Sequence, residues 1–281
     1  MVNVIAGSTS HRGRLRGIDF HWLEWGDSAS PPMVLLHGLT GHAHTWDHMA
    51  PALAARHRLF VPDQRGHGDT SAAETYVTRD FVDDLEALRE QWGIERFVLM
   101  GLSMGGHNAM AYAAAHPDRV TRLIVIDMAP KFDRRKAPNW EQISRLADEG
   151  HKRYASVDEA FADARLGNQT APDANLRYRT ELNLSEVPGG YRLKYDAKAP
   201  ARWDPADLTE QLASIRAPVL LVRGGLSTVL PRSVAERVAA LFPDATLVEV
   251  AESGHSVPTD RPEALPPIVL DWLARLTAPT R

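Results

Sequence analysis

One stretch of the chain combines a buried strand, a tight turn and a helix in a single uninterrupted run. The apolar residues 97–100 have the length and composition of a strand that is covered on both faces. They lead directly into the segment 101–105, Gly-Leu-Ser-Met-Gly, and an alanine-rich segment typical of a helix, 107–116, follows. The small residues around the serine permit a turn so sharp that its backbone is strained. The G-x-S-x-G pattern in this setting predicts that Ser103 is presented at the end of a strand.

Short apolar runs alternate with helical segments along most of the chain. The runs that we expect to form the other core strands are 33–36, 58–61, 122–126, 218–222 and 246–250. The expected helices include 46–56, 76–92, 107–116, 231–241 and 262–276. This alternation predicts an α/β fold with a mostly parallel, doubly wound sheet. The polar residues that directly follow strands should share the carboxyl edge of that sheet, where such folds bind ligands; they are His37, Asp63, Ser103 and Asp127.

The alternation stops between residues 131 and 207. No strand-like run is apparent there, helical stretches are expected near 140–149 and 157–166, and the segment is too long for an ordinary connection. We therefore expect a core formed by residues 1–130 and 208–281, with 131–207 inserted as a helical cap over the strand ends. The insertion contains the basic residues Arg134, Arg135 and Lys136, for which a solvated surface is favoured over attraction of an acidic substrate.

Composition argues against several classes of function. The formal net charge is −4 and there is no long basic run, so nucleic-acid binding has no electrostatic support. No apolar run reaches the roughly 18–20 residues of a membrane-spanning helix, and no secretory signal is apparent. The chain has no cysteine, which excludes disulfides and suits a cytoplasmic protein. The 12 histidines show no metal-ligand spacing, so we expect no metal site; the oligomeric state is undetermined.

Ser103 needs a general base in order to act as a nucleophile, because a serine hydroxyl is poorly reactive at neutral pH. His255 follows the last expected core strand in a Gly-His turn, on the same edge of the sheet as Ser103. A solvated loop histidine is the alternative interpretation. The position of His255 and its order in the chain favour the base.

Four motifs together carry a family resemblance. In chain order they are His37-Gly38, the Asp-Gln-Arg-Gly-His-Gly segment 63–68, the serine turn 101–105, and Gly254-His255. With these motifs the chain resembles the α/β-hydrolase fold family over nearly its full length. The resemblance implies a serine nucleophile, a histidine base, an acid and a cap between two late strands, with no cofactor. It also implies an oxyanion hole formed by the backbone N–H groups of Leu39 and Met104.

The acid is where the sequence departs from the family pattern. The family most often places it after the strand 218–222, but the usual position corresponds to Thr228, and no acidic residue lies between Arg223 and Pro231. Some members supply the acid after the strand that follows the nucleophile helix, where Asp127 stands. We expect Asp127 to orient His255. The alternative is that Asp127 only caps its strand and that Ser227 or Thr228 holds the histidine.

The resulting prediction is a serine hydrolase that cleaves a carboxylic ester or lactone of a small molecule through an acyl-enzyme. The catalytic residues would be Ser103, His255 and Asp127, and His37, His42 and Trp46 are candidate pocket residues. Two alternatives remain on the same fold. One is a carbon–carbon bond hydrolase or a perhydrolase, and the other is a non-catalytic, hydrolase-like ligand receptor.

Overall fold

The computed structural model describes residues 4–133 and 140–275. Its main sheet has eight strands in the order β1-β2-β4-β3-β5-β6-β9-β10. The two pairs that involve β2 are antiparallel, and all other neighbours are parallel. The predicted mostly parallel sheet is therefore confirmed. The strands are β1 (Ser8–Leu15), β2 (Ile18–Trp25), β3 (Pro32–Leu36), β4 (Arg58–Pro62), β5 (Phe97–Leu102), β6 (Val120–Ile126), β9 (Val219–Gly224) and β10 (Ala245–Val250).

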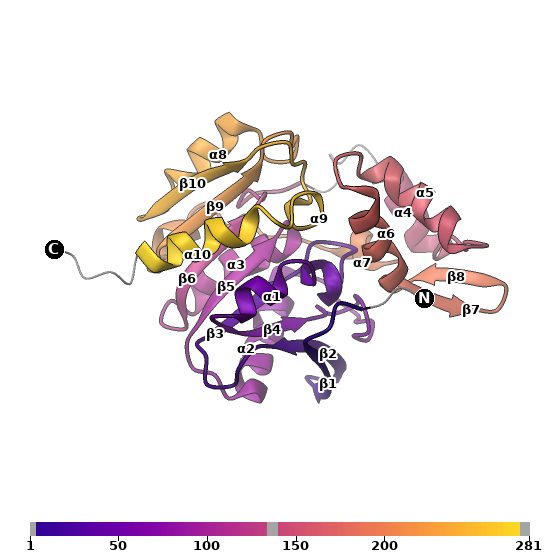
Figure 1. Cartoon of the computed structure of the whole chain (residues 1–281), viewed down its shortest axis with the longest axis horizontal. Helices are drawn as coiled ribbons and strands as arrows, with labels where there is room; N and C mark the ends of the chain where they lie inside the picture. The colour runs from indigo at the N-terminus through magenta and orange to yellow at the C-terminus, as the bar shows by residue number, and fades with distance from the viewer. Residues whose placement is uncertain (1–3, 134–139, 276–281) are drawn as a thin grey trace.

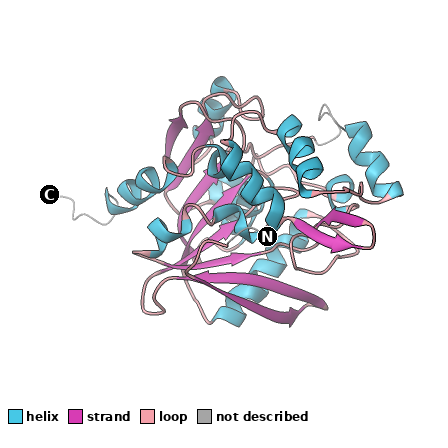
Figure 2. Cartoon of the chain, turned by 45° about the vertical axis from the view of Figure 1, so that its right-hand side comes forward, coloured by secondary structure: helices cyan, strands magenta, loops and turns pink. Residues whose placement is uncertain are grey.

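Helices cover both faces of this sheet (Figure 2). They are α1 (Ala50–Ala54), α2 (Thr78–Trp92), α3 (Met104–Ala115), α8 (Arg232–Ala239), α9 (Val257–Asp260) and α10 (Leu265–Arg275). Side chains alternate between the faces, as the pleat of a strand requires. Val34 and Leu36 of β3 pack with α2 and α3, whereas Met33 and Leu35 pack with α1 and α10.

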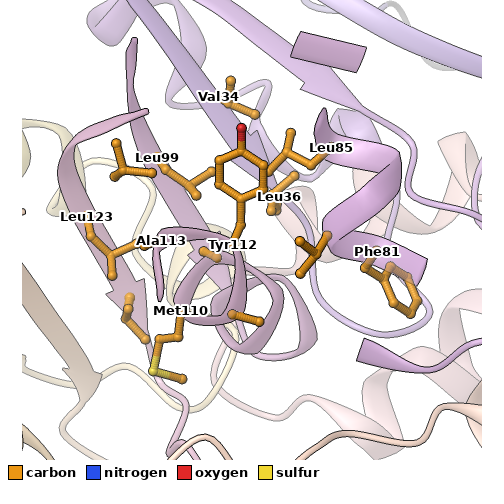
Figure 3. Close-up of a cluster of buried hydrophobic side chains, with 14 of the residues drawn as sticks. Val34, Leu36, Phe81, Leu85, Leu99, Met110, Tyr112, Ala113 and Leu123 are labelled. Carbon is orange, nitrogen blue, oxygen red and sulfur yellow. The ribbon is translucent and has the colours of Figure 1, made fainter. Parts of the chain in front are cut away.

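Figure 3 shows the first of these two cores. Tyr112 of α3 lies among strand residues that include Leu36 and Leu99, and Phe81 and Leu85 reach in from α2. The strands are apolar on both faces because both faces are covered. The packing of α2 and α3 against this side of the sheet fixes the start of α3, where Ser103 stands.

The insertion between β6 and β9 lies beside the sheet rather than within it (Figure 1). Its elements are α4 (Trp140–Glu149), α5 (Val157–Gly167), α6 (Asp173–Leu182), β7 (Leu184–Val187), β8 (Gly190–Leu193) and α7 (Ala199–Arg202). The expected helices near 140–149 and 157–166 are present. Arg134, Arg135 and Lys136 fall outside the described residues.

Two features of the insertion differ from expectation. The segment was expected to lack strands, but β7 and β8 form an antiparallel hairpin around a turn at Pro188. Gly189 and Gly190 both have positive φ there, which permits the tight connection. Helix α6 was also not expected, because its mostly polar sequence carries little helical periodicity.

A further difference lies outside the insertion. Of the predicted helix 46–56, only α1 is formed, and a 3₁₀ turn, Ala43–Trp46, precedes it.

None of the described helices has the length and apolar character needed to cross a membrane.

Candidate active site

The turn at Ser103 joins β5 to α3 with a strained backbone, φ 54° and ψ −120°. Neighbouring chain segments approach so closely that side chains would not fit. A Cβ atom on Gly101 would lie 2.2 Å from the carbonyl oxygen of Gly105, and one on Gly105 would lie 2.2 Å from that of Leu36. The glycines of the motif are therefore required by close backbone packing. The strained turn holds the Ser103 side chain at the end of its strand.

The sheet ladder brings Ser103 and Asp127 to the same edge. Leu102 pairs with Ile126, and Ile126 pairs with Val222. The ladder continues for one step, because the Ser103 N–H donates to the Ile126 carbonyl at 2.9 Å and the Asp127 N–H donates to the Val222 carbonyl at 2.7 Å. The two residues that follow these paired ends are thus adjacent. Parallel pairing explains a proximity that their 24-residue separation in the chain does not suggest.

A chain of hydrogen bonds links Ser103, His255 and Asp127. Nε2 of His255 lies 2.9 Å from Oγ of Ser103, and Nδ1 lies 2.7 Å from Oδ2 of Asp127. An ionised carboxylate only accepts hydrogen bonds, so Nδ1–H is the donor and Nε2 is free to accept the serine proton. Asp127 is fully buried, whereas the His255 side chain retains 32 % of its surface exposed. The arrangement allows proton transfer from the hydroxyl to the imidazole.

The carboxylate of Asp127 accepts two further hydrogen bonds. The Gly224 N–H donates to Oδ1 at 3.0 Å, and the Ser227 hydroxyl donates to Oδ2 at 2.5 Å. Ser227, which was considered as a partner of the histidine, therefore contacts the acid. Thr228 is exposed. The loop after β9 thus holds the carboxylate of Asp127, which directly follows β6, and contributes no acidic side chain of its own between Arg223 and Pro231.

Backbone strain is concentrated around this edge of the sheet. Within residues 4–133 and 140–275, five non-glycine residues have positive φ, and four of them lie in the loops that surround the site. The four are Thr40, Ser103, Asp127 and Glu252. Such conformations cost energy and persist only where the surrounding structure enforces them, which is common at functional sites.

The loop after β3 lies against Ser103. A Cβ atom on Gly38 would be 3.3 Å from the Cβ of Ser103. No described residue accepts a hydrogen bond from the Leu39 N–H, and Met104 opens α3, where a helix leaves its first N–H groups without intrahelical partners. Both amides therefore remain available to an oxyanion. The dipole of α3 adds positive potential at its start.

His37 supports this loop from inside the protein. Its Nδ1–H donates to the Gly38 carbonyl at 2.8 Å, and its Nε2 accepts from the Gln64 N–H at 3.0 Å. The side-chain amide of Gln64 donates to the His37 carbonyl at 2.7 Å and accepts from Asn108 of α3 at 2.8 Å. This network ties the loop to the helix that begins beside Ser103. Sequence patterns did not identify Gln64 or Asn108.

The candidate pocket residues need correction. His37 and Trp46 are fully buried, and Trp46 packs in the core on the α1 and α10 side of the sheet. Neither side chain lines an open pocket, because the loop after β3 folds over the first and the 3₁₀ turn directs the second inward. His42 is also buried, and its Nε2 donates to the Arg179 carbonyl of α6 at 3.1 Å. It joins the loop to the insertion.

Asp63 and Arg65 hold a separate, structural network. Asp63 bonds to His21 at 2.7 Å and accepts from the Ala43 N–H at 2.6 Å. Burial alone would raise the pKa of Asp63, but the hydrogen bond and charge of His21 lower it below its usual range. Arg65 pairs with Asp84 of α2 at 2.6 Å. These contacts brace the loop after β4, as expected for a structural role.

Asp260 was not identified from the sequence. Its Oδ2 accepts from the Gly254 N–H and from the Thr170 hydroxyl, both at 2.7 Å, and its Oδ1 accepts from Asn168 at 2.8 Å. It therefore fastens the residue before His255 to the insertion. No sequence signal distinguishes this aspartate, because its partners in the insertion, Asn168 and Thr170, lie 92 and 90 residues away in the chain.

A cleft of about 820 Å³ lies elsewhere, between the insertion and the loop after β4, and Ser103, His255 and Asp127 do not line it. The candidate site is therefore distinguished by its hydrogen-bonded geometry and not by the size of a cleft. Among the described residues, no group of three or more histidine, aspartate or glutamate side chains is arranged to hold a metal ion.

Four buried histidines should make the fold sensitive to acid. His37, His42, His67 and His107 are each at most 2 % exposed. Burial lowers the pKa of all four, to about 3 for His67. In the unfolded chain they titrate near 6.5, so between that pH and the folded pKa the unfolded state binds more protons. Their contribution to stability is complete above about pH 6.5 and is lost as the pH falls toward the folded pKa values.

We expect the free energy of unfolding, measured by urea titration, to fall steeply between pH 7 and pH 5. Each proton contributes about 1.4 kcal/mol per pH unit, so four histidines give a slope of at most about 5.5 kcal/mol per pH unit. A His67→Gln variant lacks one of these titrating groups. Its slope should be smaller than that of the wild type by up to about 1.4 kcal/mol per pH unit. Equal stability at pH 7 and pH 5 would show that the four side chains take up protons in the folded state.

The family described as alpha/beta hydrolase fold matches residues 31–262 of the chain. The chain belongs to the α/β-hydrolase fold family. Relatives include an sn-1-specific diacylglycerol lipase of Mus musculus, 31 % identical over 89 % of this chain and 83 % of that protein. An esterase of Mycobacterium tuberculosis is 33 % identical over 88 % of this chain and 84 % of its own length.

Solved structures agree with this membership. The structure of an E-2-(acetamidomethylene)succinate hydrolase superposes with a TM-score of 0.86 at 25 % identity, covering 95 % of this chain and 99 % of that one. Because its relatives are hydrolases and esterases, the chain is an α/β-hydrolase enzyme. The fold expected from the four motifs is confirmed.

Proposed function

We propose that this enzyme hydrolyses a carboxylic ester or lactone of a small molecule through an acyl-enzyme intermediate. The observation that carries the proposal is the continuous chain of hydrogen bonds from the Ser103 hydroxyl through His255 to the buried Asp127. This is the arrangement that serine acyl transfer requires. The esterase and lipase relatives support the same chemistry.

In the first half of the reaction, Ser103 Oγ attacks the ester carbonyl while His255 Nε2 takes its proton. The carbonyl oxygen becomes an oxyanion, which the N–H groups of Leu39 and Met104 stabilise. When the intermediate collapses, the bond to the leaving alkoxide breaks and His255 returns the proton to that oxygen. The alcohol departs and the acyl group stays on Ser103. Asp127 holds the tautomer of His255 and stabilises its transient positive charge.

In the second half, His255 removes a proton from water, and the resulting hydroxide attacks the acyl carbon. The collapse of this intermediate breaks the bond to Ser103 Oγ, which recovers its proton from His255 and releases the carboxylic acid. Water is the only co-reactant. The elements between β6 and β9 serve in this proposal as a cap, which Asp260 and His42 fasten to the two loops beside the serine.

The proposal is tested by direct labelling of the nucleophile. A fluorophosphonate probe phosphonylates activated serines: the hydroxyl oxygen bonds to phosphorus and fluoride leaves. It should modify the enzyme stoichiometrically, and mass spectrometry of the digest should locate the label on Ser103. The same labelling should abolish turnover of 4-nitrophenyl acetate and butyrate. Turnover that continues in fully labelled enzyme, or a label on another residue, would contradict the mechanism.

A further inference from the structure

One arginine beside the candidate site has no partner. Arg179 belongs to α6, and within residues 4–133 and 140–275 its guanidinium forms no hydrogen bond or ion pair. Burial lowers the pKa of Arg179 below its ordinary value, which indicates how deeply the charge is placed. The side chain nevertheless keeps some accessible surface. The side chain is therefore partly covered by the protein and partly open to a ligand.

Other deeply placed arginines are treated differently. Arg65 pairs with Asp84 at 2.6 Å, Arg89 pairs with Glu86 at 2.8 Å, and Arg223 pairs with Glu249. A charge removed from water costs free energy unless an opposite charge compensates it. Arg179 is thus the exception to the pattern that these three arginines set.

The position of Arg179 on its helix directs it between two loops. Asn175, Arg179 and Asn183 are spaced at intervals of four residues and share one face of α6 and its end. The Asn183 amide donates to the Thr40 carbonyl at 3.1 Å, in the loop after β3. The Asn175 amide donates to the Thr259 carbonyl at 3.3 Å, in α9. Arg179 therefore lies between a contact to the loop of Leu39 and a contact to the helix that follows His255.

The electrostatic surroundings agree with this placement. After burial and its other causes, the charge of Arg179 further lowers the pKa values of His37 and His42 in the loop after β3. The negative charge of Asp260, beside the loop of His255, raises the pKa of Arg179 and so partly offsets the effect of burial. Both loops flank Ser103, since Gly38 abuts its Cβ and His255 bonds to its hydroxyl.

Asp260 does not neutralise the guanidinium by contact. Its two oxygens are occupied by Asn168, Thr170 and Gly254, and it forms no ion pair with Arg179. The buried imidazole of His42 adds a second unsatisfied atom nearby. Its Nε2 donates to the Arg179 carbonyl, and its Nδ1 has no hydrogen-bond partner among the described residues. Beside α6, the guanidinium of Arg179 is therefore an unpaired, partly accessible donor, whereas His42 Nδ1 is an unpaired acceptor that is fully buried.

We propose that Arg179 binds a carboxylate of the substrate, so that the enzyme prefers esters or lactones whose acyl part ends in a second, ionised carboxylate. This inference rests on the proposed function. A guanidinium presents a planar fork of donors that matches a carboxylate in two parallel hydrogen bonds. One guanidinium also balances the single charge of a carboxylate, whereas a phosphate dianion requires more positive charge.

The test compares two substrates that differ only in that charge, the 4-nitrophenyl monoester of glutaric acid and its methyl ester, each corrected for spontaneous hydrolysis. The wild-type enzyme should show the higher kcat/KM for the anionic substrate. Arg179→Met should lower this preference by roughly 10- to 100-fold, the usual effect of losing a hydrogen bond to a charged group. Arg179→Lys should retain part of the preference.

Arg177→Met is the matched control. Arg177 is on the same helix, two residues away and therefore on a different face, and it pairs with Asp158 on the exposed side. Its replacement should leave the preference at the wild-type value. Equal kcat/KM for the two substrates in the wild-type enzyme would overturn the inference while the proposed function stands.

A binding measurement separates the two proposals. Glutarate should raise the Tm of the Ser103→Ala protein, which performs no acyl transfer, and should not raise it when Arg179→Met is added. Inorganic phosphate serves as the second arm, and a larger shift with phosphate than with glutarate would overturn the carboxylate assignment. If glutarate raised the Tm equally with and without the Arg179→Met substitution, the role of the arginine would be overturned. Failure of ester turnover with intact glutarate binding would instead count against the proposed function.

Discussion

Ser103→Ala is expected to lower kcat for 4-nitrophenyl butyrate by roughly 10⁴- to 10⁶-fold. The substitution removes the only atom that can bond covalently to the substrate in the proposed route, while the amides of Leu39 and Met104 remain. Serine hydrolases that lose the nucleophile keep only the residual acceleration from the oxyanion hole and from binding. Stopped assays at high enzyme concentration, with a fluorophosphonate titration of active sites, would measure the loss.

The control for this experiment is Ser214→Ala. Ser214 is exposed, and its hydroxyl donates only to the Gln211 carbonyl in a 3₁₀ turn that precedes β9. Its replacement should leave kcat unchanged. The Tm of the Ser103→Ala protein should not fall below that of the wild type, because alanine at this position removes a hydroxyl without opening a core cavity. Activity that survives Ser103→Ala would exclude the acyl-enzyme route.

Asp127→Asn is expected to lower kcat by about 10⁴-fold with a smaller change in KM. The asparagine fills the same space, but its NH₂ group cannot accept the Nδ1–H of His255. The Gly224 N–H donates to Oδ1 of Asp127 and would keep the asparagine carbonyl oxygen at that position, which places the NH₂ group at the Oδ2 position facing His255. The histidine would then favour the tautomer in which Nε2 carries the proton, and it could no longer accept one from Ser103.

Thr228→Val is the comparison that decides between the two positions for the acid. Ser227 bonds to Asp127, whereas Thr228, the next residue, is exposed. Because an exposed side chain contributes little, replacing Thr228 should change kcat by less than about twofold. Circular dichroism and Tm would verify that the Asp127→Asn protein is folded. If Thr228→Val lowered kcat by orders of magnitude and Asp127→Asn did not, the acid would have to act from the loop after β9.

Local patterns in the sequence were sufficient wherever the structure depends on neighbours in the chain. The apolar run 97–100 and the glycines around Ser103 specify a strand and a turn, because a turn of that geometry tolerates no side chain at its flanks. The alternation of strands and helices along the chain predicted the parallel sheet, because parallel neighbours need a crossover connection between them. The pattern also placed Asp127 directly after a strand, and the family resemblance made this position a candidate for the acid.

Features that depend on contacts between distant segments were missed. The polar sequence of α6 has little helical periodicity, and the helix is fixed by the contacts of Asn175 with Thr259 in α9 and of Asn183 with Thr40 in the loop after β3. The hairpin of β7 and β8 was missed because each strand has only four residues. Trp46 was misplaced because a 3₁₀ turn, which periodicity does not predict, directs its side chain into the core.

The sequence by itself determined the fold class and named the groups that we propose for acyl transfer, because turn geometry and side-chain chemistry depend on residues that are close together in the chain. Only the tertiary structure decided which carboxylate lies behind His255 and which charge is left without a partner. Asp127 bonds to His255 across 128 residues of chain, and Arg179 is directed between two loops by a helix from the insertion. Such relations arise from strand register and from the docking of the insertion on the sheet, which no local pattern encodes.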